Sequence, residues 1–266
     1  VNATQVRDLQ DDVTTTTFPQ MALRKSQTQI FNPRKAKGRR SEEKWYHSLY
    51  FSYGSSLYNT RREYLQQIGV EPYKQTETQR QVTHNLDFSL SSPKKYFGFL
   101  SINQSLNLED DWFDRSKQYY LDEDTQQIES RDEDGFFARH TFNYITSAST
   151  KIYGVFAPGF GDIQLIRHVV TPSLSFNYTP DFSESMWGYF QELENAEGEK
   201  VKKDRFSGTS SGGSQVVSLS VRNLFQMKTG SGDKEKKLDL FTMDFNTGFN
   251  FKAKQYRLSD LRTYWQ

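Results

Sequence analysis

Residues 82–90 read VTHNLDFSL, a run in which bulky side chains alternate with small polar ones. A period of two is that of a β-strand, because successive side chains point to opposite faces of a sheet. The same alternation returns along most of the chain, and helical periodicity is scarce. We therefore predict antiparallel strands near 17–31, 45–58, 79–91, 96–109, 135–156, 163–179, 214–228 and 238–253.

The two faces of these predicted strands differ in chemistry. One face is apolar and often aromatic, and the other consists mainly of Ser, Thr and Asn. A soluble sandwich usually places many Lys and Glu residues on its solvent face, whereas small uncharged polar residues suit the wetted interior of a barrel. By itself the pattern leaves both a barrel and a soluble sheet open.

The links between the predicted strands are alternately long and short. Those at 59–78, 110–134 and 180–213 are long, the last rich in Gly and Ser, and those at 92–95, 157–162 and 229–237 are short. Outer-membrane barrels sort their connections in this way, with short periplasmic turns and longer outer loops. The strands also reach the roughly 9–11 residues that a tilted strand needs to cross a bilayer. The order of the links therefore favours a barrel of which about eight strands are present.

Two features interrupt the alternation. The stretch 135–156 is too long for a single parity, and its pattern slips near 147–151, which predicts a bulge. Pro19 and Pro172 fall inside predicted strands, where the missing N–H predicts a bulge or a frayed end.

Composition narrows the classes of function. The 266 residues carry a formal net charge of +1 and no cysteine, so a strong electrostatic field, a disulfide framework and a thiolate metal site are not expected. No apolar run approaches the roughly 20 residues of a membrane helix, and mean hydropathy is −0.81, yet 21 Phe and 15 Tyr are present. A transmembrane barrel has such totals because only every second strand residue faces lipid. The first residues lack the pattern of a signal peptide, so we expect an internal piece of a longer chain.

The most specific stretch of the sequence runs from Gly154 to Phe182. It contains Arg167, His168, Thr171, Pro172, Phe176, Tyr178, Pro180, Asp181 and Phe182. This stretch resembles the barrel of the LptD (OstA) family, the lipopolysaccharide-assembly proteins of the outer membrane, and above all its Bacteroidetes-like members. Weaker blocks follow in the family's order at 17–20, 45–53 and 218–227. The resemblance indicates an internal barrel segment, 1–266, without the family's periplasmic jellyroll.

The resemblance implies transport and no enzyme activity. Lipopolysaccharide would reach the outer leaflet with its sugar part in a polar lumen and its acyl chains leaving through a lateral gate. The implied partners are lipopolysaccharide, outer-membrane lipids, a lipoprotein plug and periplasmic Lpt bridge proteins, and no cofactor is implied. Two other classes stay open: a different outer-membrane barrel, such as a porin or nutrient receptor, and a soluble β-sheet binding module.

Strand parity then assigns single side chains. If 157–162 is a periplasmic turn, His168 faces outward near the periplasmic interface and Tyr178 lies in the outer aromatic girdle. Arg167 would pair with a lumen carboxylate such as Asp87 or Asp244, or meet a sugar or phosphate group. The residues that we expect to face the lumen are Arg167, Thr171, Ser173, Ser175, Asn177, Asn85, Asp87, Asn103 and Asp244.

The sequence gives little support for a catalytic site, a metal site or a nucleic-acid site. None of the four histidines lies in a nucleophile elbow or beside a patterned carboxylate pair, so no catalytic residue is predicted. The acidic residues of 110–134 lack the full EF-hand spacing, which favours a solvated loop over a metal site. The basic run at 34–40 has no nucleic-acid fold signature beside it and is predicted to be a solvated turn, with acidic lipid phosphates or an assembly partner as the alternative.

Overall fold

The computed structural model describes residues 2–8, 12–31, 44–68, 71–91, 95–159, 161–230 and 235–266. The basic run at 34–40 lies outside these described residues. None of the helices in the described ranges is long and apolar enough to cross a membrane. The elements, with two short 3-10 helices written η, are β1 (Asn2–Asp8), β2 (Val13–Gln29), η1 (Trp45–Ser48), β3 (Leu49–Ile68), β4 (Glu71–Ser91), β5 (Ser101–Leu121), β6 (Ile128–Ser149), β7 (Ile152–Phe156), β8 (Ile163–Thr179), η2 (Ser185–Trp187), β9 (Phe190–Glu194), β10 (Lys200–Asp204), β11 (Ser214–Thr229), β12 (Lys236–Asn250) and β13 (Arg262–Trp265).

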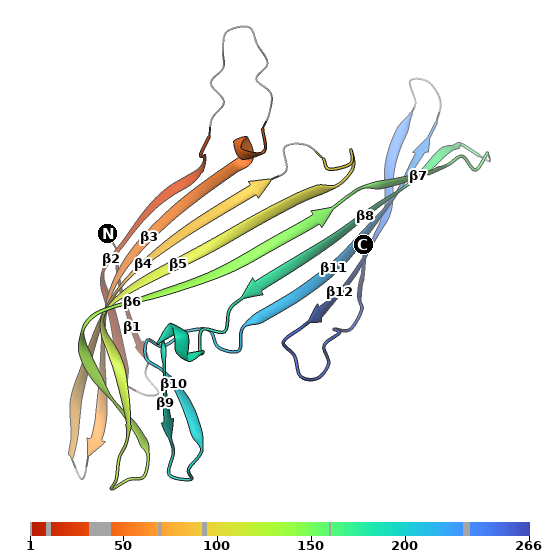
Figure 1. Cartoon of the computed structure of the whole chain (residues 1–266). Coiled ribbons are helices and arrows are strands. Elements are labelled where there is room, and N and C mark those ends of the chain that lie inside the picture. Colours follow the sequence, from red (N-terminus) through yellow and green to blue (C-terminus); the bar gives the residue numbers. More distant parts are fainter. Residues whose placement is uncertain are drawn as a thin grey trace.

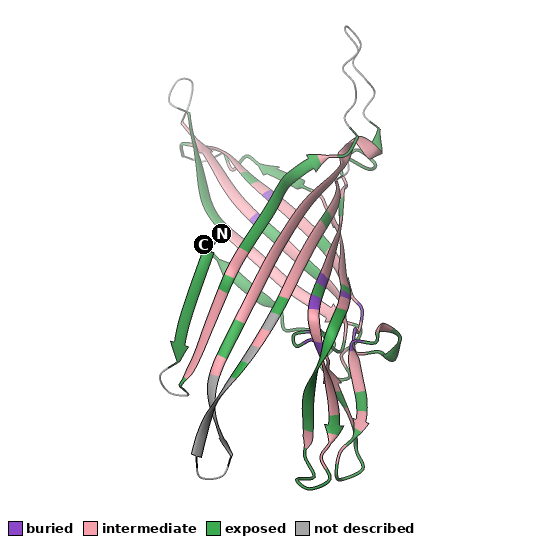
Figure 2. Cartoon of the chain, turned by 90° about the vertical axis from the view of Figure 1, so that its left-hand side faces the viewer, coloured by how far each residue is buried: buried purple, intermediate pink, exposed green. Residues whose placement is uncertain are grey.

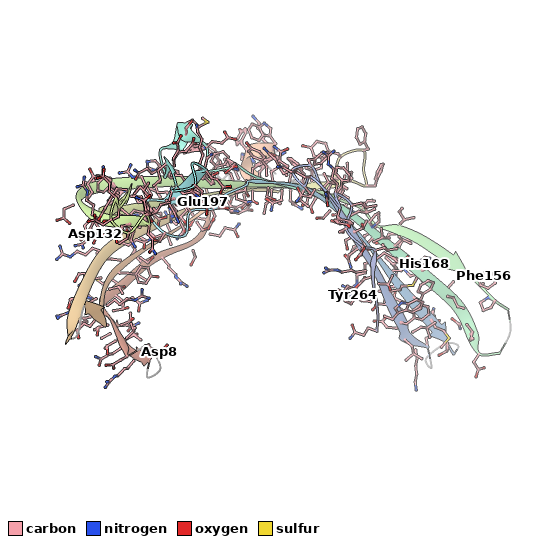
Figure 3. The ribbon with its side chains drawn as sticks, turned by 90° about the horizontal axis from the view of Figure 1, so that it is seen from below. Asp8, Asp132, Phe156, His168, Glu197 and Tyr264 are labelled. Atoms are coloured by element: carbon pink, nitrogen blue, oxygen red, sulfur yellow. The ribbon has the colours of Figure 1, made fainter. Side chains whose placement is uncertain are left out.

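Eleven of the strands form one antiparallel sheet. Its order is β1-β2-β3-β4-β5-β6-β8-β11-β12-β13, with β7 pairing to β8, while β9 and β10 form a separate hairpin. Neighbours in the chain are neighbours in the sheet almost throughout (Figure 1). The sheet bends into an arch when viewed along its strands (Figure 3), and within the described residues β1 and β13 do not pair. The prediction of an all-β antiparallel fold is confirmed, as an open sheet.

Two of the predicted long loops are wrong. The stretch 59–78 is a continuation of β3 and β4, paired from Asn59↔Arg80 to Ile68↔Glu71. The stretch 110–134 is a continuation of β5 and β6, paired as far as Leu121↔Ile128. Both hairpins project beyond the rest of the sheet (Figure 1), so neither of their faces needs to be apolar and the alternation that reveals a strand is lost. Backbone pairing and cross-strand contacts hold them instead, as where Arg131 Nε donates to Gln118 Oε1 at 2.9 Å.

The predicted bulge near 147–151 is also wrong. The pairs Ser149↔Ser173 and Ile152↔Val170 keep the same register with β8, so β6 and β7 follow one line along that strand. The line is interrupted at Thr150 and Lys151, opposite Pro172 and Thr171. Thr150 donates its backbone N–H to the Pro172 carbonyl at 3.2 Å, but proline has no N–H to return. The missing donor thus divides the predicted strand without shifting it. The bulge or frayed end predicted at Pro172 itself is also wrong, because β8 runs through this residue in unbroken register with β11.

The other boundaries follow the predictions to different degrees. The strand predicted at 163–179 coincides with β8. The one predicted from 45 begins with η1, and the one predicted from 96 begins at Ser101. At Pro19 the register with β3 shifts between Thr17 and Gln20, which confirms an irregularity there.

The well-buried part of the molecule is small and lies at one end. The sheet is a single layer, and most of its residues are half-buried or exposed (Figure 2). Four aromatic residues form the buried cluster, and three of them come from the segment 180–213: Phe113, Phe182, Tyr189 and Phe206. This segment was predicted as a long loop, but it contains η2, β9 and β10, and it fills the space beside β6 beyond the end of β8 (Figure 1).

Candidate functional site: the polar face of the sheet

One face of the sheet is polar across many strands. Directly opposed residues of an antiparallel pair point to the same face. The register gives a continuous row, Asn103↔Ser147↔Ser175↔Ser218↔Gly248, from β5 to β12. At the edge of the sheet Tyr264 is opposite Asp244 on this polar face, and in Figure 3 it lies on the inner side of the arch.

The register brings all the predicted lumen residues to this face. On β8, Arg167, Thr171, Ser173, Ser175 and Asn177 alternate with apolar neighbours. Thr171 is opposite Arg222, which is opposite Asp244, and Asn85 is opposite Glu109 while Asp87 is opposite Asn107. Sequence parity therefore assigned these nine side chains to one surface.

The two carboxylates expected as partners of Arg167, Asp87 and Asp244, are wrong. Its guanidinium lies 4.7 Å from the centre of the Tyr153 ring. Asp87 instead accepts a hydrogen bond from Ser52 at 3.0 Å, and Asp244 lies 3.9 Å from Arg222. Arg167 is separated from both carboxylates by the position of its strand, which parity alone does not report.

Amide side chains form a hydrogen-bonded ladder across three strands. Asn107 Nδ2 donates to Asn143 Oδ1 at 3.2 Å. Asn143 Nδ2 in turn donates to Asn177 Oδ1 and, at 2.9 Å, to Thr179 Oγ1. Each amide has both donors and acceptors, so the ladder still offers free hydrogen-bonding positions to a ligand.

A cavity of about 240 Å³ lies on the polar face beside this ladder. Its strand residues include Asn85, Asp87, Asn107 and Asn143, and the segment 180–213 contributes Thr209 and Ser210. Most of the residues that line it carry an amide, a hydroxyl or a carboxylate, and Leu108, Phe142 and Phe182 add apolar surface. The polar groups can donate to and accept from the hydroxyls of a hydrated glycan.

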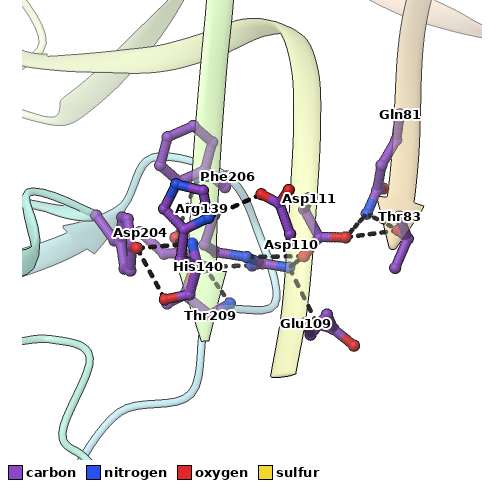
Figure 4. A network of polar contacts seen from close by, with 11 residues as sticks. Gln81, Thr83, Glu109, Asp110, Asp111, Arg139, His140, Asp204, Phe206 and Thr209 are labelled. Atoms are coloured by element: carbon purple, nitrogen blue, oxygen red, sulfur yellow. Dashed lines mark hydrogen bonds and ion pairs between the residues drawn. The ribbon is translucent and has the colours of Figure 1, made fainter. Parts of the chain in front are cut away.

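A buried charge network adjoins this cavity, whose lining includes Arg139 and Thr209. Figure 4 shows the network. Asp111 is 1% exposed and Arg139 is 6% exposed. Arg139 donates to Asp111 Oδ2 through Nε at 3.1 Å and through Nη2 at 2.6 Å. The other carboxylate oxygen accepts from Thr83 and, at 3.0 Å, from Gln81. Both charges are therefore paired and hydrogen-bonded, as buried charges need to be.

The same network fastens the segment 180–213 to the sheet. Arg139 Nη1 donates to Thr209 Oγ1 at 2.9 Å, and Thr209 donates to Asp204 at 2.7 Å. Phe206 stacks on Phe113 with ring centres 5.0 Å apart. Sequence reasoning missed this anchor: Asp111 lay in a predicted solvated loop, and no local pattern shows that two charges far apart in the chain will be buried together.

The histidines lie on the apolar face or at its ends. His140 Nδ1 is 2.8 Å from Asp110, a carboxylate contact that the sequence did not predict. His84 contacts the Tyr53 hydroxyl at 2.7 Å, and His168 contacts Asn223 at 2.9 Å. In the described ranges, no serine or threonine hydroxyl is hydrogen-bonded to these imidazoles, and no group of three or more His, Asp or Glu side chains is placed to hold a metal ion.

Comparison with known proteins identifies the family. The family model described as LptD protein matches residues 1–266, the whole chain. The chain belongs to the LptD family. No curated protein and no solved structure matches it. Membership confirms the resemblance seen in the sequence and, at a coarse level, assigns the chain to lipopolysaccharide assembly at the outer membrane.

The LptD-like motif residues have distinct structural positions. Pro172 interrupts the β6–β7 line, and His168 stacks on Phe225 with ring centres 4.1 Å apart. Phe176 and Tyr178 lie on the apolar face, opposite Thr146 and Tyr144. Phe182 is 1% exposed in the aromatic cluster. The motif thus marks the strand β8 and its junction with the segment 180–213.

Asp181 organises that junction in the LptD-like chain. It follows β8, outside the strands, and accepts hydrogen bonds from the Ser183 hydroxyl at 2.6 Å and from the backbone N–H groups of Ser183 and Gly212 at 2.9 Å. The Ser183 hydroxyl, more than any other group, lowers the pKa of the Asp181 carboxyl, although partial burial opposes it. The ionised carboxylate holds the start and the end of the segment 180–213 together.

Proposed function

We propose that this chain is a section of an outer-membrane β-barrel that moves lipopolysaccharide to the outer leaflet through a polar lumen and a lateral gate. The observation that carries the proposal is the continuous row from β5 to β12. By strand parity it shares a face with Tyr264, which lies on the inner side of the arch (Figure 3). The family match over residues 1–266 supplies the coarse role. The polar face would contact the hydrated sugar part, because hydroxyls and amides can both donate and accept hydrogen bonds.

The opposite face supports contact with lipid. It carries Leu174 and Leu219, which are directly opposed and are 50% and 41% exposed. At the end with short turns, Trp45, Phe97 and Phe99 are 64%, 86% and 55% exposed. Near the other end, Trp112 and Phe136 pack edge to face. Exposed aromatic residues at both ends of an apolar band are typical of the two membrane interfaces.

The proposal also assigns orientation and partners. The turns at 95–100 and 157–162 would lie on the periplasmic side, and the projecting hairpins and the segment 180–213 outside. Lipopolysaccharide and outer-membrane lipids would be the ligands, and a lipoprotein plug and periplasmic Lpt bridge proteins the protein partners. The function is conduction and assembly rather than catalysis, in line with a family of transport proteins.

Two alternatives make different demands. Another outer-membrane barrel, such as a porin or nutrient receptor, would share the two faces but would not require the lipid-exit step. A soluble β-sheet module would need its apolar face covered. The family match favours the assembly protein over both.

The test begins with membrane fractionation of the source cell, using an antibody to the segment 180–213. We expect the antigen in the outer membrane and resistant to alkaline extraction. The same antibody should bind intact cells, and depletion of the protein should reduce the lipopolysaccharide that a non-permeant reagent labels at the cell surface. A soluble antigen would refute the membrane proposal. An outer-membrane antigen whose depletion leaves surface lipopolysaccharide unchanged would favour a porin or receptor.

A further inference from the structure

A second cavity lies where the two projecting hairpins diverge. The pairing of β4 with β5 ends at Gln81↔Phe113, whereas each strand continues within its own hairpin. The resulting gap of about 290 Å³ is bordered by Arg205, Phe206 and Ser207 of the segment 180–213. Its lining is rich in hydroxyls and cations: Thr15, Thr60, Arg62, Thr78, Arg115, Ser116, Lys117, Asp132, Arg205, Phe206 and Ser207.

Four of these lining residues are cations and one is a carboxylate. Two of the cations are already paired, since Arg115 lies 3.0 Å from Asp132 and Arg205 lies 3.2 Å from Glu133. Asp114 and Asp134, each 3.8 Å from Arg115, add further negative charge at the rim. These carboxylates hold the two arginines in place and reduce the net positive charge of the cavity.

The other two cations, Arg62 and Lys117, reach the cavity from β3 and β5. Of the carboxylates whose side chains the structure describes, none is within 4.0 Å of either. Threonine hydroxyls from three strands stand beside them. Ser116 is 2% exposed, and its hydroxyl accepts a hydrogen bond from Arg205 Nη2 at 3.0 Å and donates one to Glu133 Oε2 at 3.4 Å, so it is already paired within the protein.

This donor set fits a phosphate group. An arginine, a lysine and several hydroxyls offer many donors to an anion with three or four oxygen acceptors, and charge-assisted hydrogen bonds are the stronger kind. An uncharged sugar would be served better by the amide-lined cavity on the other side of Phe206, where Gly208, Thr209 and Ser210 line the wall. Consecutive parts of one segment therefore separate a cavity suited to sugar hydroxyls from one suited to an anion.

We propose that the cavity between the two hairpins binds a phosphate group through Arg62 and Lys117. The proposal rests on the proposed function, in which a phosphorylated glycan would meet the amide-lined cavity and this cavity side by side. The same chemistry would also accept free inorganic phosphate, so the two sources need separate probes.

The test uses the intact protein in lauryldimethylamine oxide micelles, which contain neither sugar nor phosphate. Ligand-observed NMR would measure binding of glucose 6-phosphate, inorganic phosphate and glucose. The variant Arg62→Gln/Lys117→Gln removes these two cations, and Lys200→Gln/Lys252→Gln is the control with the same change of charge at exposed positions. We expect glucose 6-phosphate to bind the native protein and the control equally and the first variant at least about tenfold more weakly, with affinity falling as salt rises.

The other probes separate the outcomes. Inorganic phosphate binding with the same loss in the first variant would show that the phosphate group alone is sufficient. Binding of glucose 6-phosphate only would show that the sugar must carry it. The proposal is overturned if glucose binds as well as glucose 6-phosphate, if the two variants behave alike, or if no phosphate ligand binds. None of these results contradicts the proposed function if the protein still fractionates with the outer membrane. A soluble protein would refute the proposed function independently.

Discussion

Replacement of Asp111 by Asn should detach the segment 180–213 from the sheet. The substitution keeps the shape of the side chain but leaves the Arg139 charge, 6% exposed, without its carboxylate. Loss of one partner of a buried pair typically costs about 3–5 kcal/mol, because the remaining charge is desolvated and uncompensated. Two contacts soften the loss here: Arg139 keeps its bond to Thr209, and Glu109 lies 4.0 Å away. We therefore expect the lower value, about 3 kcal/mol.

The effect should be local and large. Arg139 joins the sheet to Thr209, so its misplacement loosens the segment 180–213 rather than the strands. A change of about 3 kcal/mol raises the open population of the segment roughly 100-fold. Limited proteolysis in membranes measures this population when opening is fast relative to cleavage. The matched control is Glu192→Gln, which removes an exposed pair with Lys200 in the same segment and should cost no more than about 1 kcal/mol.

A double variant tests the explanation. Arg139→Gln combined with Asp111→Asn removes both charges, so cleavage should be slower than in Asp111→Asn alone. Equal cleavage of Asp111→Asn and Glu192→Gln would show that the buried pair does not anchor the segment. A double variant that is cleaved faster than either single variant would show that the two charges act separately.

Three further predictions concern the faces of the sheet and the junction. Leu174→Lys should destabilise the protein in lipid vesicles by up to about 2–4 kcal/mol if its face contacts lipid. Ser175→Lys, on the polar face, should have little effect on the free energy of unfolding. Equal midpoints of urea unfolding for the two variants would contradict the assignment of faces. Gly213→Ala should destabilise the junction by at least about 1 kcal/mol, because Gly213 has φ +58° and the added Cβ would lie 2.9 Å from the Asp181 backbone nitrogen. Gly212→Ala, with φ +83° and open space around the added Cβ, is the milder control. Thermal unfolding would compare the two variants. Because folding lowers the pKa of Asp181, its stabilising contribution is complete above the unfolded pKa of about 3.9 and is lost as pH falls through the lower folded value. Hydrogen exchange at the Gly212 amide should therefore lose protection in acid relative to Asp181→Asn, and parallel pH profiles of the two proteins would exclude the mechanism.

Alternation along single strands was enough to predict much of this protein. It revealed the antiparallel sheet, the β8 boundaries, and the common face of nine side chains from Asn85 to Asp244. The reason is local, because successive side chains of a strand point to opposite faces. Where the two faces of a sheet meet different environments, every strand must therefore alternate apolar and polar side chains. The bulge or frayed end predicted at Pro172 did not follow from the residue alone, because β8 keeps its register with β11 and the missing N–H interrupts the neighbouring β6–β7 line instead.

What depends on contacts distant in sequence was decided only by the tertiary structure. The hairpins at 59–78 and 110–134 are established by backbone pairing, because their sequences lack the alternation that marks the other strands. The Asp111–Arg139–Thr209 network joins charges and hydroxyls from β5, β6 and the segment 180–213, and burial alone makes it an anchor. The cavity near Arg62 and Lys117 exists because two hairpins diverge and a third segment borders the gap. Sequence periodicity determines which face a side chain takes, but its neighbour on that face is set by register, strand twist and packing between elements far apart in the chain.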